Sequence, residues 1–567
     1  MTRGAETLGP TEPMEGVVYA PPAQTLKYLK AGVLTRETLA DAFRASFTRH
    51  ASRWALRGPG CDLRYAALDE MTDCIAAALL ERGLNPLDRV IFQLRNSPEL
   101  VLLLIACFKA GLIPVCTLAA HREHEIGYLG ELSAARLHVV QGDDPKFDDV
   151  AFAHRMRARL PAMRWVVQAR GDAREGATTV RELASSITLE AAREKLRSLV
   201  LDPFQVALFQ LSGGTTGVPK IIPRMHNEYL YNLRATIRAH DYSQDDVLFA
   251  PLPMMHNLNM ACGYGPMLLA GGTVVIDDSV QTPDMVRTLQ EYQPTWLLMG
   301  ALTGRIQPAL ESGDLRFTRL RGAICGAGSP ALSRLLGVRV RHVFGMTEGV
   351  IMFTQPHHPQ EVLDTMVGQP VSEFDQVRLF VSGTEQEITE PGIEGECAFS
   401  GPYTIHGYYK AEERNRQTFT STGMYRSGDL MLFHDIDGQR YYQFRGRTKD
   451  LVSRGGEKIN CEEVETLVLR HPAVADVMVI ALPDPDYGER ACAVLIARPG
   501  GSAPDVSALG AFLQVQGLAK FKWPERVEVL DQFPTTSSGK KSKVLLKELI
   551  LTRSGSSAKT TRGELAS

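Results

Sequence analysis

The chain has 567 residues, of which 44% are hydrophobic and 22% charged, and its net charge is −3. This length exceeds what one hydrophobic core organises, so we expect two or more domains. The near-neutral charge gives no sign of a nucleic-acid or membrane-surface partner, and nine cysteines without a Cys-x-x-Cys pair support neither a zinc site nor a disulfide framework.

The N-terminal 16 residues are polar and lack the apolar segment of a signal peptide. The longest apolar run, Leu100–Cys107, is far too short to cross a bilayer. With its scattered cysteines, the chain therefore predicts a cytoplasmic protein.

Strand-like and helix-like segments alternate along most of the chain. A helix is predicted from Ser97-Pro98-Glu99, with proline in its first turn, to Gly111, and another begins at Pro283. The apolar runs that predict strands cover residues 90–94, 113–118, 136–140, 206–211, 273–276, 295–299, 323–325 and 338–344. This alternation predicts a mostly parallel, doubly wound α/β architecture.

After residues 444–450 the pattern changes. Helices are predicted at 461–470 and 506–516, and strands at 474–480, 491–497 and 526–530, enough for a compact α+β domain of about a hundred residues. The expected organisation is an N-terminal extension over residues 1–40, a large domain over 41–447, a small mobile domain over 448–552 and a disordered tail over 553–567.

A loop rich in glycine and threonine follows the strand predicted at 206–211. Backbone N–H groups of its glycines can turn toward phosphate oxygens, its threonine hydroxyls add donors, and Lys220 adds a positive charge. The spacing is not that of a Walker A loop, because no Gly-Lys-Ser/Thr follows. Taken alone, the string is equally compatible with a flexible Ser/Gly loop.

Seven segments together resemble the adenylate-forming enzyme superfamily, in order and spacing, from about residue 40 to 550. They are Ser212–Lys220, Pro251–Asn257, Gly326–Gly328, Phe344–Glu348, Tyr425–Asp429, Gly446–Glu457 and Pro534–Lys540. The resemblance implies that a carboxylate attacks the α-phosphate of ATP, giving an acyl-adenylate and pyrophosphate, and that a thiol then displaces AMP.

The resemblance also implies roles toward ATP. Phosphoryl transfer requires charge neutralisation and alignment, and Mg²⁺ prefers carboxylate and phosphate oxygens. The loop would bind the β- and γ-phosphates through Ser212, Gly213, Gly214, Thr215, Thr216, Gly217 and Lys220. Thr347 would bind the α-phosphate, Glu348 would hold Mg²⁺, Phe344 would stack on adenine beside Gly326 and Ala327, and Asp429 and Arg447 would bind the ribose.

Lys540 would bridge the carboxylate and the ribose side of the adenylate as charge develops. Each of these residues has an ordinary alternative. By itself Glu348 or Lys540 would be a solvated charge, Asp429 a turn residue and Phe344 a core residue. The shared pattern favours the functional roles over these alternatives.

Within the superfamily, the chain is most similar to free-standing aryl-acid ligases that activate 2,3-dihydroxybenzoate or salicylate. The similarity lies in residues 219–224, 401–413 and 454–458. It implies an acid pocket at His256, Asn257 and Cys262, in which Asn257 donates to an ortho-hydroxyl. Asn257 is neutral, which disfavours an α-amino acid, and Cys262 replaces the serine that binds a 3-hydroxyl, which favours a salicylate-like acid.

Two departures from the subfamily pattern, Leu258-Asn259 and Cys325-Gly326, keep other aryl acids open, such as a hydroxyanthranilate or hydroxypicolinate. Cys262 is equally compatible with a buried packing role.

No carrier-protein segment is visible, so the thiol acceptor is expected to be a separate aryl carrier protein with a phosphopantetheine arm, or coenzyme A. By the resemblance, Gly455 would border the pantetheine tunnel and Lys449 would be the hinge about which the small domain rotates. The expected function is aryl-acid activation in siderophore or other nonribosomal peptide biosynthesis. The alternatives are an aryl-CoA ligase and, from another class, a non-catalytic nucleotide-binding scaffold.

Overall fold

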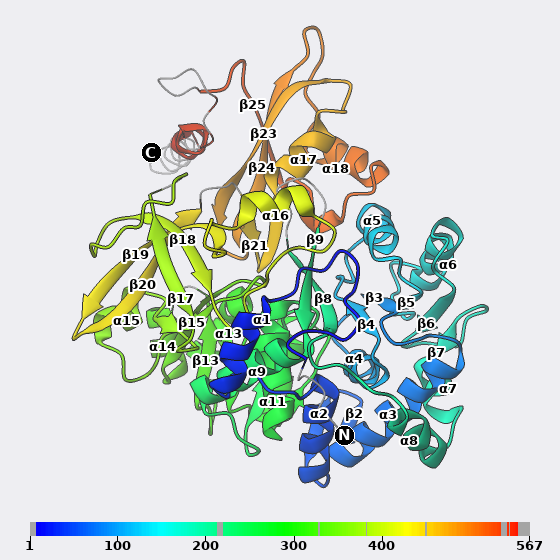
Figure 1. The fold of residues 1–567 in the computed structure, drawn as a ribbon. Helices are drawn as coiled ribbons and strands as arrows, with labels where there is room; N and C mark the ends of the chain where they lie inside the picture. The colour runs from blue at the N-terminus through cyan, green and yellow to red at the C-terminus, as the bar shows by residue number, and fades with distance from the viewer. Residues whose placement is uncertain are drawn as a thin grey trace. The chain divides into compact units, whose positions relative to one another are not determined.

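The computed structural model describes residues 7–212, 219–279, 281–326, 329–381, 383–447, 451–534, 541, 543 and 545–553. The chain divides into two compact units, one built from most of residues 1–446 and a smaller one built mainly from the chain after residue 446. Figure 1 traces the order of their helices and strands.

The first sheet of the larger unit has seven strands. In spatial order they are β7 (Thr178–Thr179), β6 (Trp165–Gln168), β5 (Leu137–Val140), β3 (Arg89–Gln93), β4 (Ile113–Val115), β8 (Val206–Ser212) and β9 (Lys220–Met225). Every pair is parallel except β8 and β9, which form an antiparallel hairpin. Pro223 is tolerated in β9 because this strand lies at the edge of the sheet.

The second sheet has nine strands. They are β16 (Gln369–Pro370), β15 (Ile351–Phe353), β14 (Val340–Gly345), β13 (Gly322–Cys325), β12 (Trp296–Leu298), β10 (Val247–Phe249), β11 (Thr273–Val275), β1 (Trp54–Gly58) and β2 (Cys61–Arg64). The six strands from β14 to β1 are parallel, and the antiparallel strands β15, β16 and β2 complete its edges.

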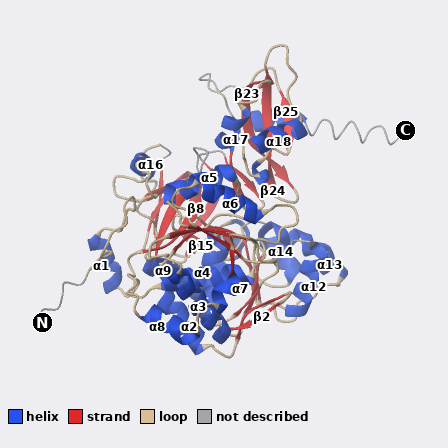
Figure 2. Cartoon of the chain, turned by 90° about the vertical axis from the view of Figure 1, so that its right-hand side faces the viewer, coloured by secondary structure: helices blue, strands red, loops and turns tan. Residues whose placement is uncertain are grey.

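Helices cover both faces of the two large sheets, and Figure 2 shows them gathered around the strands of the larger unit. The α-helices of the larger unit are α1 (Pro22–Lys30), α2 (Leu39–Arg49), α3 (Tyr65–Glu81), α4 (Pro98–Ala110), α5 (Glu123–Ser133), α6 (Asp149–Arg159), α7 (Val180–Ser185), α8 (Leu189–Arg197), α9 (His226–His240), α10 (Asn257–Asn259), α11 (Gly265–Ala270), α12 (Thr282–Tyr292), α13 (Thr303–Ser312), α14 (Ser329–Leu336), α15 (Gln360–Thr365) and α16 (Glu412–Thr418). One cluster joins α2, α3, α4, α9 and α11 to both sheets.

Successive residues of the buried strands point to opposite faces. Val90 and Phe92 of β3 pack in the cluster between the two sheets, whereas Ile91 packs under α5 and α6. In β12, Trp296 likewise faces the shared cluster and Leu297 faces α12, α13 and α14. Strands buried on both faces read as continuous apolar runs, which is how they were predicted.

A third sheet completes the larger unit and a fourth forms the smaller one. The third contains β17 (Gln376–Phe380), β18 (Gly395–Ser400), β19 (Tyr425–Ile436) and β20 (Gln439–Arg447). The fourth contains β22 (Glu457–Asn460), β21 (Leu451–Arg454), β24 (Gly488–Ala497), β23 (Val474–Asp484) and β25 (Arg526–Val529), beside α17 (Cys461–Val468) and α18 (Val506–Val515). The predicted fold class, a doubly wound α/β unit followed by a smaller α+β unit, is confirmed.

Several element bounds lie within a few residues of those that the sequence predicts. The helix predicted to begin at Pro98 is α4, capped by Ser97, whose hydroxyl accepts from the Leu100 N–H at 3.1 Å. Gly111 ends this helix with φ 69°, a left-handed conformation that glycine adopts without strain. Among the strands that the sequence analysis did not identify is β9, which the proline in its middle disguises.

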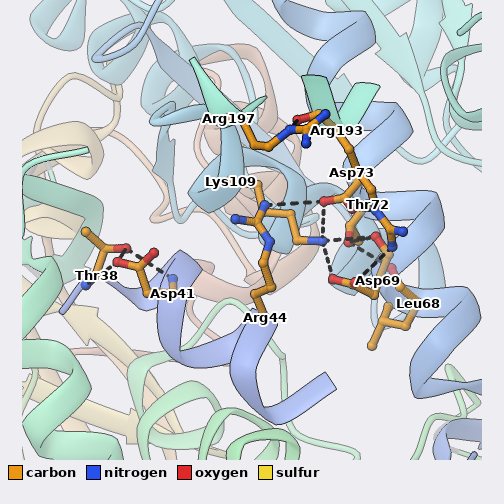
Figure 3. A network of polar contacts seen from close by, with 10 residues as sticks. All are labelled: Thr38, Asp41, Arg44, Leu68, Asp69, Thr72, Asp73, Lys109, Arg193 and Arg197. Carbon is orange, nitrogen blue, oxygen red and sulfur yellow. Dashed lines mark hydrogen bonds and ion pairs between the residues drawn. The ribbon is translucent and has the colours of Figure 1, made fainter. Parts of the chain in front are cut away.

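A buried lysine joins α3 to α4 (Figure 3). Lys109 Nζ lies 2.6 Å from Asp69 Oδ1 and 2.7 Å from Asp73 Oδ1, and its side chain is fully buried. Arg193 of α8 contacts Asp73 at 3.0 Å. Burial alone would raise the pKa of Asp73, but the adjacent Lys109 and Arg193 outweigh it and lower the pKa. The network holds three helices together by compensated charge.

Among the described residues, no helix is both long enough and apolar enough to cross a bilayer.

Candidate functional site

The predicted phosphate loop connects β8 to β9 in the chain. Ser212, the last residue of β8, is paired with Lys220, the first residue of β9. The Ser212 hydroxyl oxygen is buried and makes no hydrogen bond in the described structure. An unpaired buried hydroxyl costs about 1–3 kcal/mol, so this group is suited to a polar ligand. Gly213, Gly214, Thr215, Thr216 and Gly217 lie outside the described residues.

Glu348 is buried at the centre of a cluster of hydroxyl groups. The residue is only 5% exposed. Its Oε1 accepts a hydrogen bond from the Tyr408 hydroxyl at 2.8 Å. The Tyr425 hydroxyl lies 2.8 Å from that of Tyr408. Burial, reinforced by the negative charge of Glu348, raises the pKa of both tyrosines well above the usual value. Both phenols therefore stay neutral and act as hydrogen-bond donors.

Lys220 approaches the same cluster from β9. Its Nζ lies 4.7 Å from the centre of the Tyr408 ring. The hydroxyl of the same tyrosine contacts Glu348. A lysine and a carboxylate are thus brought to one tyrosine from positions more than a hundred residues apart. The arrangement combines a cation, which can bind phosphate, with an anion, which can bind a hard divalent cation.

Thr347, beside Glu348, is held by an arginine that the sequence analysis did not identify as a site residue. Arg224 of β9 is completely buried and its Nη1 donates to the Thr347 carbonyl oxygen at 2.8 Å. Its Nε and Nη2 form a two-pronged pair with Glu228 of α9 at 2.9 and 2.8 Å. Nη2 also contacts the Tyr403 carbonyl at 3.2 Å. Arg224 therefore ties the Thr347–Glu348 loop to β9 and α9.

Asp429 and Tyr425 lie on β19. This strand brings Asp429, the residue predicted to bind the ribose, near Glu348. Asp429 is 3% exposed, and its backbone N–H donates to the Ser427 hydroxyl at 3.0 Å. The carboxylates of Glu348 and Asp429 both act electrostatically on Tyr425. Arg447 ends the neighbouring strand, β20.

The predicted adenine site lies at the ends of β13 and β14. Phe344 is partly buried in β14, with its ring centre 5.7 Å from that of Phe444. Gly326 follows β13, and its carbonyl oxygen lies 2.5 Å from His342 Nε2. Burial lowers the pKa of His342, while contacts of its ring with the Gly326 and Met366 carbonyls partly oppose that shift. Ala327 lies outside the described residues.

Asn257 of the predicted acid pocket is oriented by a buried tyrosine. The Tyr229 hydroxyl donates to Asn257 Oδ1 at 2.8 Å, and Asn257 is 8% exposed. This bond identifies Oδ1 as the acceptor, which leaves the amide Nδ2 as the donor. The preceding His256 is partly buried. An amide whose direction is set in this way can donate to an oxygen of a ligand.

Cys262 lies five residues further on, in a π-helical turn from Met260 to Tyr264. Such turns are common at functional sites. Burial raises the pKa of the Cys262 thiol to about 12, and the thiol contacts the Thr236 hydroxyl of α9. Asn259 donates through Nδ2 to the carbonyls of Ala250 at 3.1 Å and Leu252 at 2.6 Å, while its buried Oδ1 makes no hydrogen bond in the described structure. Asn259 therefore has no donor left for a ligand.

In the smaller unit, Gly455 forms the turn between β21 and β22. Its φ of 56° is left-handed, and a Cβ there would lie 3.1 Å from the Tyr487 ring. Apart from its predicted role at the thiol tunnel, this position favours glycine because its backbone is left-handed. Lys449, Lys540 and the tail from residue 554 lie outside the described residues.

Arg224, Glu228, Tyr229 and Tyr408 are the site residues that the sequence analysis missed. One signal could have found the first two: an arginine four residues before a glutamate can form an ion pair on one face of a helix start, here beside the apolar residues Ile221, Ile222 and Leu230. The tyrosines gave no such signal, because buried tyrosines are common in cores.

Comparison with known protein families gives two matches. The AMP-binding enzyme model matches residues 43–409, and the AMP-binding enzyme C-terminal domain model matches residues 463–540.

The chain also resembles individual proteins along most of its length. It is 34% identical over 534 residues to the 2,3-dihydroxybenzoate-AMP ligase of Bacillus subtilis, covering 92% of this chain and 95% of that protein. It is 34% identical to a salicylyl-CoA synthase / salicylate adenylyltransferase of a Streptomyces species, covering 94% and 98%. The apo structure of Mycobacterium smegmatis MbtA has a TM-score of 0.70 at 30% identity, covering 94% and 98%.

Proposed function

The chain belongs to the AMP-binding enzyme family, and from this premise we propose that it is an aryl-acid–AMP ligase. An oxygen of the acid's carboxylate bonds to the α-phosphorus of ATP and pyrophosphate leaves. A phosphopantetheine thiol of a separate carrier protein then bonds to the acyl carbon, and AMP leaves. The product enters siderophore or other nonribosomal peptide biosynthesis, and nine free cysteines are compatible with a reducing cytoplasm.

The observation that carries this proposal is the orientation of Asn257. The Tyr229 hydroxyl already donates a hydrogen bond to Asn257 Oδ1. The N–H₂ group of the neutral amide is therefore the group that would donate to the ligand. That donor suits the ortho oxygen of an aromatic acid, whereas the ammonium group of an α-amino acid requires a carboxylate. The similarity to a dihydroxybenzoate ligase and to a salicylate adenylyltransferase supports the same substrate class.

Residues of the larger unit would bind and align ATP. The predicted phosphate loop, with Ser212 and Lys220, would bind the β- and γ-phosphates, Thr347 the α-phosphate and Asp429 the ribose. Glu348 fits a magnesium ligand, because Mg²⁺ is usually bound through one or two carboxylates plus substrate phosphates. In the described part of the chain no group of three acidic, His or Cys side chains could hold a metal by itself. Bound Mg²⁺ would supply charge neutralisation at the phosphates.

The remaining roles follow from the family resemblance. Phe344 would stack on adenine beside Gly326 and Ala327, and Arg447 would assist at the ribose. Lys540 would stabilise the charge that develops during adenylation. Lys449 would act as the hinge, and Gly455 would border the thiol tunnel in the second half-reaction.

Coenzyme A is the alternative acceptor. The name of the Streptomyces relative combines a CoA synthase with an adenylyltransferase, so both activities are associated with one similar chain. Thioester formation with coenzyme A and with a phosphopantetheinylated aryl carrier protein, measured side by side, separates the two.

The proposed function is tested by acid-dependent ATP–pyrophosphate exchange. The panel comprises salicylate, 2,3-dihydroxybenzoate, benzoate, anthranilates, picolinates and amino acids. We expect exchange with ortho-substituted aryl acids and none above background with amino acids. Exchange driven best by an α-amino acid, or absent with every compound, contradicts the proposal.

Arg224 is expected to position the Thr347–Glu348 loop for catalysis. This role can be separated experimentally from its contribution to stability. Arg224→Met leaves the Glu228 carboxylate, whose side chain is 13% exposed, without its charged partner, which should lower the free energy of unfolding by at most about 3–5 kcal/mol in urea denaturation. Arg224→Met combined with Glu228→Met should recover most of that stability. Because neither variant can bind the Thr347 carbonyl, both should lower kcat of pyrophosphate exchange by about tenfold or more. A double variant with wild-type kcat would contradict the positioning role.

Selectivity between aryl acids is expected to depend on Cys262. Asn257 pairs with the ortho oxygen, but a thiol gives a 3-hydroxyl only a weak partner, at a cost of about 1–3 kcal/mol. Salicylate should therefore exceed 2,3-dihydroxybenzoate by roughly ten- to hundredfold in kcat/KM. Cys262→Ser should shrink or invert that ratio and leave KM for ATP nearly unchanged.

The matched control for this experiment is Cys107→Ser, which changes another buried cysteine, one that packs in α4. It should leave the selectivity ratio unchanged. If the wild-type protein prefers the dihydroxy acid, the role of Cys262 is wrong.

A further inference from the structure

A short segment of the larger unit, residues 401–405, packs directly against the Thr347–Glu348 loop. The Ile405 N–H donates to the carbonyl oxygen of Glu348 at 2.9 Å. Gly349 approaches the segment so closely that a Cβ at this position would lie 2.9 Å from Thr404 Oγ1. The position of the loop, and with it that of the proposed ATP ligands, therefore depends on how residues 401–405 are held.

Tyr403 connects this segment to the loop through its backbone and through its side chain. Its carbonyl oxygen accepts from Arg224 Nη2 at 3.2 Å, and the same guanidinium donates to the Thr347 carbonyl through Nη1 at 2.8 Å. The Tyr403 hydroxyl oxygen, which is completely buried with its ring, accepts from the Ile351 N–H at 3.3 Å. Tyr403 is thus linked to the loop before Glu348, through Arg224, and after it, at the first residue of β15.

The Tyr403 hydroxyl is itself oriented by a carboxyl group. It donates to Asp375 Oδ2 at 2.5 Å. Asp375 is in turn fixed, because its N–H donates to the Ser372 carbonyl at 3.1 Å and its carboxyl group lies against Gly401, where any Cβ would collide with Oδ1. A phenol has only one hydrogen to donate, so the bond to Asp375 leaves the lone pairs of the oxygen for the Ile351 N–H.

The surroundings of Asp375 favour its uncharged form. Burial raises the pKa of Asp375 to about 8, although hydrogen bonds from the Tyr403 hydroxyl and the backbone of Ser372 oppose the shift. Burial, and to a lesser extent the charge of Asp375, also raises the pKa of Tyr28 and Tyr231. At pH 7 the acid is therefore mainly neutral, and its oxygen accepts from Tyr403 as an amide oxygen would. An asparagine should be able to replace it.

We propose that Tyr403 is a positioning residue for adenylation and that Asp375 acts through it. This role rests on the proposed function, in which Thr347 and Glu348 bind the α-phosphate and Mg²⁺. Without the hydroxyl, the Ile351 N–H loses its partner and the loop is held less firmly. A misplacement of about 1 Å at a reacting site can cost a hundredfold in rate. MgATP should then bind more weakly and react more slowly.

Tyr403→Phe tests the proposal, because it keeps the buried ring and the backbone bond to Arg224 and removes only the hydroxyl. We expect the Kd for MgATP, measured by calorimetry without any acid, to rise at least fivefold. The kcat of pyrophosphate exchange should fall about tenfold. KM for salicylate should stay within about twofold, because Asn257 is held separately, by Tyr229.

The calorimetric measurement needs no acid, so it distinguishes this role from the proposed function. If no acid in the panel drives exchange but Tyr403→Phe still weakens MgATP binding, the proposed substrate class is wrong and the positioning role stands. If exchange proceeds and Tyr403→Phe leaves both the Kd for MgATP and kcat unchanged, the proposed function stands and the positioning role is wrong.

Variants of Asp375 show whether it acts through Tyr403. Asp375→Asn should keep kcat and the Kd for MgATP within about twofold, because the amide oxygen still accepts from the hydroxyl. Asp375→Leu should reproduce the losses of Tyr403→Phe. The double variant should be no worse than either single variant, because both changes remove the same hydrogen bond. Additive losses in the double variant would overturn the proposal. If Asp375→Leu does not fold, Tyr403→Phe and Asp375→Asn decide the matter.

The matched control is Tyr65→Phe, which removes another buried tyrosine hydroxyl. The Tyr65 hydroxyl donates to the Gly272 carbonyl at 2.5 Å, at the end of α11 and away from the Thr347–Glu348 loop in the chain. This variant should lower the melting temperature but leave kcat and the Kd for MgATP unchanged. If it lowers MgATP affinity as much as Tyr403→Phe does, the effect is a general loss of stability and the proposal is overturned.

Discussion

Glu348→Gln is expected to lower kcat of acid-dependent pyrophosphate exchange by at least about a hundredfold. The amide keeps the shape of the side chain and can still accept the hydrogen bond from Tyr408. It lacks the negative charge that a magnesium ligand requires, so the charge at the phosphates is no longer neutralised. The measurement is exchange at saturating acid and ATP over a series of Mg²⁺ concentrations.

Two controls distinguish loss of charge from loss of structure. Tyr408→Phe removes the hydrogen bond but keeps the carboxylate, and should cost much less than Glu348→Gln. Glu361→Gln changes an exposed carboxylate at the start of α15 and should have no effect. If Glu348→Gln retains exchange within fivefold of the wild-type rate, Glu348 is not the magnesium ligand.

Lys540→Ala is expected to separate the two half-reactions. The loss of its positive charge should reduce adenylation by about a hundredfold or more, because this charge acts only as the acyl-adenylate forms. Transfer from pre-formed acyl-adenylate to the thiol should remain within about threefold of wild type. Pyrophosphate exchange measures the first step, and single-turnover thioester formation measures the second.

The neighbouring lysine provides the matched control. Lys541 forms an ion pair with Asp476 in the smaller unit, so Lys541→Ala should leave both half-reactions unchanged. If Lys540→Ala lowers the rates of adenylation and of thiol transfer equally, Lys540 does not act in the first half-reaction alone. A bulky substitution at Gly455 cannot replace this experiment, because its left-handed backbone is strained by any other residue.

The local features of this protein were predictable from its sequence. The helix from Pro98 to Gly111 follows from a serine cap, a proline in the first turn and a terminal glycine. The buried parallel strands follow from short apolar runs, and the α+β unit after residue 450 from a change in that pattern. These signals are local, because they depend on residues close together in the chain.

The division of the strands into two sheets could not be predicted in the same way. Strands β3 and β10 carry similar apolar runs, yet they belong to different sheets. Which strands pair depends on long-range packing against shared helices, and that information is spread over the whole core.

The candidate site shows the same distinction. Motif resemblance pointed to Glu348, Thr347 and Asp429, but not to the groups that orient the first two. Tyr408 reaches Glu348 across 60 residues of chain, and Arg224 reaches Thr347 across 123. The sequence by itself determined which chemical groups are present and how segments such as α4 fold locally, although not β9. Only the tertiary structure decided which hydroxyl and which guanidinium hold them, because hydrogen bonds depend on distances that folding sets between remote segments.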